Sequence, residues 1–210
     1  MKINMFVAII TGSLAVILSS GCAKREIANI DSKGKNIICF GDSITAGYGV
    51  SPGQDYPAQL AKLLGRPVIN AGNSGETSRD ALKRLVPDVL KKDPCLVIIE
   101  FGGNDFLKKI PVSDTVTYVQ EMTERIQAEG AMVAIADVSS AMVMGECSKE
   151  LSRLSKKYQA IFIPRLMAGI LTTPSLKSDF IHPNAEGYTL IAERVYKYLK
   201  PYLEKNSTSH

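Results

Sequence analysis

The 210-residue sequence has few of the residues that build metal centres and disulfide frameworks. It contains two histidines, His182 and His210, which excludes a histidine-rich metal centre. It contains four cysteines at irregular spacing, and the three that remain beside Cys22 form neither a disulfide pattern nor a zinc pattern. Cys39 and Cys95 lie in apolar segments, where a thiol behaves as a small hydrophobe. No metal and no other cofactor is therefore expected.

Charge of one sign is also scarce. The 25 lysines and arginines nearly balance the 21 aspartates and glutamates, which leaves a formal net charge of +4 and no run of like charges. Nucleic acid is therefore not expected as a partner. Internal repeats and low-complexity segments are absent from the sequence as well.

The first residues have the pattern of a secretory signal. An uncharged stretch, 3–23, is broken by a Thr-Gly-Ser run at 11–13, so it is too short and interrupted for a membrane span. Small residues after Leu18 end in Cys22, which resembles a bacterial lipobox with its leucine one place early. We expect residues 1–21 to be a lipoprotein-type signal peptide, and an exported chain anchored through a lipid on Cys22, facing the periplasm or the exterior. The alternatives are an ordinary cleaved signal or an uncleaved anchor.

The rest of the chain fits one domain. Residues 22–35 are polar and without pattern, so we expect a tether there. Residues 36–204 are long enough for one domain with a substantial core, and residues 205–210 should be a disordered tail. A monomer is expected.

Five short apolar segments alternate with segments of helical periodicity. The expected strands are 37–40, 68–70, 95–101, 132–136 and 161–163. The expected helices are 54–64, 77–89, 113–128, 148–158 and 184–198, the last ending before Pro201. This alternation predicts an α/β fold, a three-layer α/β/α sandwich with a five-stranded parallel sheet.

The unusual polar and glycine-rich segments all follow expected strands. Gly41-Asp42-Ser43 follows the first strand, Asn70–Thr77 the second, Gly102–Asp105 the third and, after a longer loop, Ser178–Pro183 the fifth. In a parallel doubly wound sheet these loops share one edge, at which ligands bind. The sequence therefore predicts a single site at that edge.

Chemical roles can be assigned to five residues of these segments. Ser43 stands between a strand and a helix, where a nucleophile can be presented, and His182 is the only histidine in the domain that could activate it. Asp179 can hold the far ring nitrogen of that histidine. The backbone amides of Ser43 and Gly75 and the side-chain amide of Asn104 could stabilise an oxyanion.

Each of these residues also has a structural explanation. Ser43 could be a helix N-cap, and Asp179 and His182 could cap the final helix. Asn104 and Asp105 could be an ordinary turn or an N-cap pair. Gly75 alone indicates only a tight turn. Their joint occurrence at one sheet edge favours a site over these separate explanations.

Four segments together resemble the SGNH, or GDSL, hydrolase family. They are Gly41–Thr45, Gly75 within Asn70–Thr77, Gly102–Asp105 and Asp179–Pro183, and the resemblance covers roughly residues 36–202. Within the family the chain is most similar to single-domain bacterial esterases that act as thioesterase, arylesterase and lysophospholipase.

The resemblance implies a flavodoxin-like SGNH hydrolase fold and assigns roles to the same residues. The family's nucleophile falls on Ser43, its acid and base on Asp179 and His182, and its oxyanion donors on Ser43, Gly75 and Asn104. Phe180 stands where the family often has a small residue.

Apolar residues after the third and fourth strands indicate what the site accepts. Leu107, Ile110, Met142 and Met144 would suit an acyl chain, or else pack beneath their loops. We expect a serine esterase that cleaves acyl esters or thioesters, of lysophospholipid or aryl ester type, through an acyl-enzyme. Two alternatives remain open: a carbohydrate O-acetylesterase on the same fold, and a non-catalytic binding lipoprotein.

Overall fold

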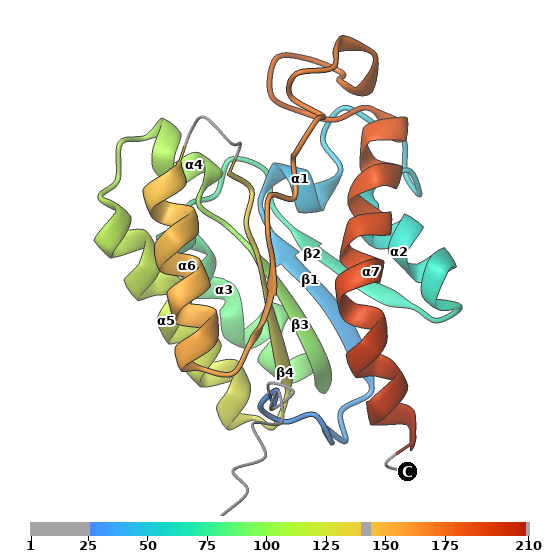
Figure 1. Ribbon diagram of the computed structural model, residues 1–210, viewed down its shortest axis with the longest axis vertical. Coiled ribbons are helices and arrows are strands. Elements are labelled where there is room, and N and C mark those ends of the chain that lie inside the picture. The colour runs from blue at the N-terminus through green and yellow to red at the C-terminus, as the bar shows by residue number, and fades with distance from the viewer. Residues whose placement is uncertain (1–25, 140–143, 209–210) are drawn as a thin grey trace, which may run out of the picture.

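Figure 1 shows a computed structural model that describes residues 26–139 and 144–208. The strands are β1 (Asn36–Gly41), β2 (Val68–Gly72), β3 (Pro94–Glu100), β4 (Met132–Ala136) and β5 (Ile161–Ile163). They form one sheet in the order β2-β1-β3-β4-β5, and every neighbouring pair is parallel. The predicted five-stranded parallel sheet is confirmed.

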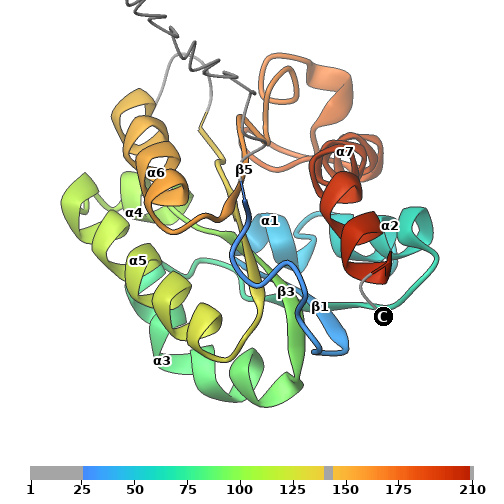
Figure 2. The ribbon, with the colours of Figure 1, turned by 60° about the horizontal axis from the view of Figure 1, so that its bottom comes forward.

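Helices cover both faces of the sheet, as Figures 1 and 2 show. The helices are α1 (Ser43–Ala46), α2 (Tyr56–Leu64), α3 (Ser78–Asp88), α4 (Gly103–Leu107), α5 (Val112–Ala128), α6 (Gly145–Lys157) and α7 (Ala185–Thr208), with short 3-10 turns at Leu90–Lys92 and Pro174–Leu176. Side chains of α2 and α7 pack on one face, and those of α3, α5 and α6 pack on the other. The three-layer sandwich is therefore confirmed.

The central strands are apolar on both faces because each face has its own core. Ile37 and Cys39 of β1 point to the core under α2 and α7, whereas Ile38 and Phe40 point to the core under α3, α5 and α6. This alternation follows from the two-residue period of a strand. It explains why continuous apolar runs, rather than alternating ones, predicted the strands correctly.

The N-terminal boundary of the domain lies earlier than predicted. Ile27, assigned to a tether, is 6% exposed and belongs to the core under α2 and α7. The Ala28 amide donates to Gln159 O, and Asn29 Nδ2 donates to Gln127 O and Ala131 O. The tether assignment was wrong from residue 27 onward, because the two isoleucines of this polar stretch, Ile27 and Ile30, are too few to give a periodic signal.

The predicted end of the last helix was also wrong. Helix α7 continues past Pro201 to Thr208, through most of the predicted tail. Tyr202 and Leu203 pack against the core, and these contacts offset the hydrogen bond that a proline removes from a helix. Apolar contacts with the core thus keep the chain helical beyond Pro201, where a proline would be expected to end the helix.

Several predictions fall outside the described residues. They concern the signal peptide at 1–21, the lipidated Cys22, Met142 and the last two residues. Within residues 26–139 and 144–208, none of the helices combines the length and the apolar character that crossing a membrane requires.

Gly72 allows α1 to lie directly against the end of β2. A Cβ atom at this position would come within 2.1 Å of Ala46 N and 2.6 Å of Ala46 Cα. Those atoms belong to the backbone of α1, so a rotamer change cannot relieve the clash. The absence of a side chain at Gly72 therefore fixes where the helix that carries Ser43 rests.

We expect Gly72→Ala to lower the free energy of unfolding by about 1–3 kcal/mol, because α1 must move away from β2. Urea denaturation measures the change. Gly145→Ala is the matched control, since an added Cβ there meets no atom within 4 Å, and it should change stability by less than about 0.5 kcal/mol. Equal losses in the two variants would contradict this explanation.

Candidate active site

Ser43 is the first residue of α1, directly after β1. The N-cap of this helix is Asp42, whose Oδ1 accepts a hydrogen bond from the Ile44 amide at 3.0 Å. Because Asp42 caps the helix, the Ser43 hydroxyl is not needed for capping. The N-cap explanation of Ser43 is therefore wrong.

The Ser43 hydroxyl points at the domain's only histidine. Ser43 Oγ lies 3.0 Å from His182 Nε2, and His182 Nδ1 lies 2.8 Å from Asp179 Oδ2. A carboxylate only accepts hydrogen bonds, so Nδ1 carries the ring hydrogen and Nε2 of the neutral ring can accept the serine proton. The three side chains form a chain of hydrogen bonds in the order serine, histidine, aspartate.

The carboxylate of Asp179 is held by its own turn. Its Oδ1 accepts the backbone amides of Ile181 at 2.9 Å and His182 at 2.8 Å. The hydrogen bond from the His182 side chain, together with these two amides, lowers the pKa of Asp179 from 3.8 to about 2. The group therefore stays ionised throughout the pH range in which an imidazole can act as a base.

The loop that carries Asp179 is attached to the start of α7 by other residues. The Gly187 amide donates to Asn184 Oδ1 at 3.0 Å, and Asn184 Nδ2 donates to Ser175 O at 2.7 Å. Asn184 thus caps α7, and the alternative that Asp179 and His182 form this cap is wrong. Their side chains remain available to each other and to Ser43.

Two tyrosines support the imidazole. The ring of Tyr48 lies with its centroid 4.4 Å from that of His182. The buried Tyr188 of α7 donates its hydroxyl to Tyr48 O at 3.0 Å. The histidine is therefore confined both by the aspartate and by an aromatic ring that α7 fixes in place.

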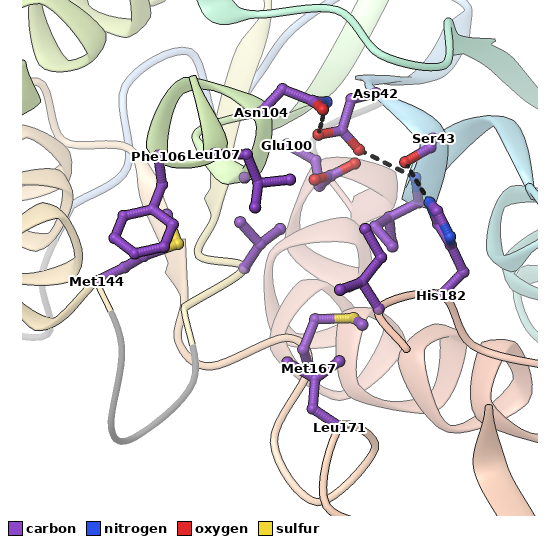
Figure 3. Close-up of a pocket in the computed structure, with 14 residues that line it drawn as sticks. Asp42, Ser43, Glu100, Asn104, Phe106, Leu107, Met144, Met167, Leu171 and His182 are labelled. Carbon is purple, nitrogen blue, oxygen red and sulfur yellow. Dashed lines mark hydrogen bonds between the residues drawn. The ribbon is translucent and has the colours of Figure 1, made fainter. Parts of the chain in front are cut away.

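The side chain of Asn104, on α4, lies beside Asp42 and Ser43 (Figure 3). Its Nδ2 donates to Asp42 Oδ2 at 2.9 Å, which fixes the orientation of the amide. An amide nitrogen carries two hydrogens, so one remains for another acceptor. The N-cap of α4 is Gly102, so the explanation of Asn104 as a cap is wrong.

The neighbouring Asp105 fixes α4 to α3. Its buried carboxylate accepts the amide of Ser78 at 3.0 Å, the Ser78 hydroxyl, and the Thr115 hydroxyl at 3.2 Å. Sequence analysis gave Asp105 no role beyond a turn. The structure makes it the residue that holds the helix on which Asn104 is mounted.

The two predicted backbone donors lie at the same sheet edge. Among the residues that the structure describes, the amides of Ser43 and Gly75 have no hydrogen-bond partner. Gly75 has a φ of +80° and does not line the pocket described next. Its carbonyl accepts from Lys108 Nζ at 2.9 Å, which ties its loop to the end of α4.

A cavity of about 260 Å³ opens beside Ser43 and His182 (Figure 3). Its polar lining comes from the residues already described, together with Glu100 and Gly103. Its apolar lining is Ile44, Phe106, Leu107, Val138, Met144, Met167, Leu171 and Ile181. The cavity is therefore polar only at the end that holds the serine and the histidine.

Two of the four residues predicted to line the substrate site lie at this cavity. Leu107 and Met144 line the cavity, whereas Met142 lies outside the described residues. Ile110 does not line it. The Ile110 amide donates to Asp105 O at 2.9 Å, just after the end of α4. Met167 and Leu171 were missed, since they reach the cavity from a long loop that no local pattern places.

Two buried carboxyl groups lie beneath the site. Glu100 is fully buried at the end of β3, and its Oε2 accepts the Thr45 hydroxyl at 2.7 Å. Burial and the charge of Asp42 raise the pKa of Glu100 well above its usual value. Burial also raises the pKa of Asp42, from 3.8 to about 6. The signal that could have identified Glu100 is that it is the one charged residue in the apolar run 95–101.

The raised pKa of Asp42 predicts how stability depends on pH. Between about pH 4 and pH 6 the folded protein retains a proton that the unfolded chain has released, so this group's contribution to stability falls as pH rises. Urea denaturation of the parent and Asp42→Asn should show the parent losing about 1–3 kcal/mol relative to the variant across this window. If the difference in unfolding free energy between the parent and Asp42→Asn stays constant from pH 4 to pH 6, or if the parent gains stability relative to the variant, the raised pKa of Asp42 is contradicted.

The described residues contain no group of three or more histidine, cysteine, aspartate or glutamate side chains arranged to hold a metal ion. The polar groups of the site are instead joined to one another by hydrogen bonds. The arrangement can transfer a proton from Ser43 to His182 and can offer hydrogen-bond donors to a nearby oxyanion.

Comparison with known proteins adds to this geometry. Residues 39–190 match the GDSL-like Lipase/Acylhydrolase family. Esterase TesA of Pseudomonas aeruginosa is 28% identical over 203 residues, which cover 90% of this chain and all of that protein. Thioesterase 1/protease 1/lysophospholipase L1 of Escherichia coli is 29% identical over 180 residues, covering 81% of this chain and 86% of that protein.

Solved structures agree with the sequence relatives. The crystal structure of the psychrotrophic esterase EstA from a Pseudoalteromonas species, inhibited by monoethylphosphonate, superimposes with a TM-score of 0.72 and 28% sequence identity. The match covers 80% of this chain and 98% of that one. The chain belongs to the GDSL-like lipase/acylhydrolase family, and it is an ester-hydrolysing serine hydrolase.

Proposed function

We propose that the chain cleaves acyl esters and thioesters by a two-step mechanism with Ser43 as nucleophile. Ser43 Oγ attacks the carbonyl carbon while His182 Nε2 takes the hydroxyl proton, and Asp179 stabilises the imidazolium that forms. His182 then gives the proton to the leaving alcohol or thiol. Water, with His182 again as base, hydrolyses the resulting acyl-enzyme.

The oxyanion of each tetrahedral intermediate would accept the backbone amides of Ser43 and Gly75 and the second hydrogen of Asn104 Nδ2. The free state of both amides and the fixed orientation of Asn104 support these assignments. Asp42 is a positioning residue in this mechanism, because it holds Asn104 without touching the substrate.

The apolar cavity is the main observation in favour of acyl esters and thioesters as substrates. Eight apolar side chains line it, and its single polar end holds Ser43 and His182. An acyl chain gains by leaving water for such a cavity, whereas a sugar would leave its hydroxyls without partners. The names of the relatives, which include thioesterase and lysophospholipase, support acyl thioesters and lysophospholipids as substrates.

A panel of aryl esters from acetyl to dodecanoyl, set against acetylated glycans, tests this proposal. We expect kcat/KM to rise from acetyl to medium-length chains, by roughly threefold for each methylene that enters the cavity. Activity confined to acetyl groups would support the carbohydrate O-acetylesterase instead. No turnover of any ester, with correctly folded protein, would support a binding lipoprotein.

We also propose that Cys22 carries a lipid anchor on an exported chain. Ile27 already packs in the core, so at most about 18 Å of extended chain separates the two residues. The chain enters the domain at the amino ends of the strands, whereas Ser43 lies at their carboxyl ends. The six residues of β1 alone separate these two ends by about 20 Å. An anchored domain would therefore turn its site away from the membrane that holds it.

A further inference from the structure

Large apolar side chains gather around the opening of the cavity and remain exposed to solvent. The apolar rim, as we call it, consists of Tyr48, Phe106, Leu107, Phe180 and Ile181. Among the described residues, only Leu63 and Tyr198 are other large apolar side chains of similar exposure. Single exposed apolar residues are common on proteins, but five around one opening are typical of a binding surface.

The rim has two sides. Phe106 and Leu107 project from α4, and they lie across the cavity from His182 in Figure 3. Ile181 and Phe180 belong to the loop before α7, on the side of Tyr48 and His182. Because Phe106, Leu107 and Ile181 also line the cavity, the exposed rim is continuous with the apolar interior.

Phe180 is the most exposed member of the rim. Its side chain is 93% exposed, although it lies between Asp179 and His182 in the turn that the Asp179 carboxylate holds. Packing inside the protein does not require a phenyl ring at this position. An exposed aromatic ring on a fixed turn is suited to entering an apolar phase outside the protein.

Two exposed lysines adjoin the rim. Lys108 and Lys109 follow Leu107, and neither forms an ion pair with any residue in the described part of the chain. Of the nearby carboxylates, Glu76 is paired with Arg84 at 2.6 Å, whereas Asp179, bonded to the neutral His182, keeps its negative charge. The two lysines place positive charge without an ion-pair partner beside the exposed apolar groups, which suits an anionic lipid surface.

We propose that the apolar rim docks the site onto the surface of an anionic phospholipid bilayer that faces it, a different bilayer from the one that would hold the Cys22 anchor. The rim side chains enter the boundary between headgroups and acyl chains, and the two lysines lie at the level of the phosphates. This deepens the proposed function, on which it rests for the choice of substrate. An acyl chain could then pass from the bilayer into the cavity without crossing water.

The sequence contains no tryptophan, so a single introduced one reports on its own surroundings alone. The full chain carrying Ser43→Ala, which leaves the lipids intact, is given Phe180→Trp and mixed with vesicles of phosphatidylcholine and phosphatidylglycerol with brominated acyl chains. We expect its emission to move to shorter wavelength and to be quenched. Vesicles without phosphatidylglycerol should require roughly fivefold more lipid for each lysine involved.

Leu63→Trp in the same background is the matched control, because Leu63 is exposed near the end of α2, away from the rim. Its emission should not change, even where the N-terminal segment binds the vesicles. An unchanged emission at position 180, or equal quenching at both positions, would overturn the proposal. If the emission at position 180 shifts without lipid and depends on the protein concentration, the rim binds a second copy of the chain, and the proposal is overturned.

A kinetic measurement completes the test. We expect Phe180→Ser to lower the rate on an acyl ester embedded in such vesicles about tenfold more than the rate on a water-soluble short-chain ester. Equal rates of the variant and the parent on both substrates would overturn the docking. Failure of the proposed hydrolysis is distinguished from failure of docking, because the fluorescence experiment uses a chain without the Ser43 hydroxyl.

Discussion

Replacing Ser43 by alanine should lower kcat/KM for a short-chain aryl ester by about 10⁵-fold. The Ser43 hydroxyl lies 3.0 Å from His182 Nε2, and without it no acyl-enzyme can form. The residual rate would come from the oxyanion donors and from substrate binding alone. Steady-state hydrolysis of the aryl ester, followed by release of the phenol, measures the loss.

The control for this variant is Ser113→Ala, which removes an exposed hydroxyl at the start of α5 and should leave the rate at the parental value. His182→Ala should lose about as much activity as Ser43→Ala, and the double variant should lose little more, since the residues act as one unit. A Ser43→Ala chain that keeps a tenth or more of the activity would contradict the assignment.

Replacing Asn104 by alanine should lower kcat by about 10²- to 10³-fold, with a much smaller change in KM. The side-chain amide would bond an oxygen whose charge develops only in the transition state, so its loss affects the reaction more than substrate binding. The variant also leaves Asp42 Oδ2 without its partner, so stability should fall by about 1–3 kcal/mol. Kinetics of a medium-chain ester with folded protein separate the two effects.

Asn73→Ala is the matched control, because Asn73 is an exposed amide at the same sheet edge that donates to Glu76 Oε1 at 2.6 Å. Its kcat should stay within about twofold of the parent. A kcat that falls equally in both variants would indicate a general disturbance of the edge. A loss confined to KM in Asn104→Ala would assign Asn104 to substrate binding and not to the transition state.

The central part of the fold could be predicted from the sequence because its signals are local and repeated. Continuous apolar runs marked the five strands, and Thr77 was identified as a helix start, which the structure confirms by its side-chain bond from the Asp80 amide. The start of the domain and the end of its last helix could not be predicted, because each depends on contacts distant in the chain. Ile27 and Leu203 both pack in a core that the sequence does not display.

The candidate site shows the same division. Ser43, Asn104, Asp179 and His182 could be found because each follows a strand that ends at one edge. The cavity could be found only in part, since Met167 and Leu171 reach it through a long loop after β5. Exposure is also invisible in a sequence, and the outward position of Phe180 emerged only with the structure.

Covalent labelling tests the central claim, that Ser43 is the nucleophile, most directly. The full chain is treated with a fluorophosphonate, digested, and its peptides are sequenced by mass spectrometry. We expect one adduct, on Ser43, whose formation is lost in His182→Ala because the imidazole no longer takes the serine proton. An adduct on another residue, or no adduct on folded and unmodified protein, would contradict the account.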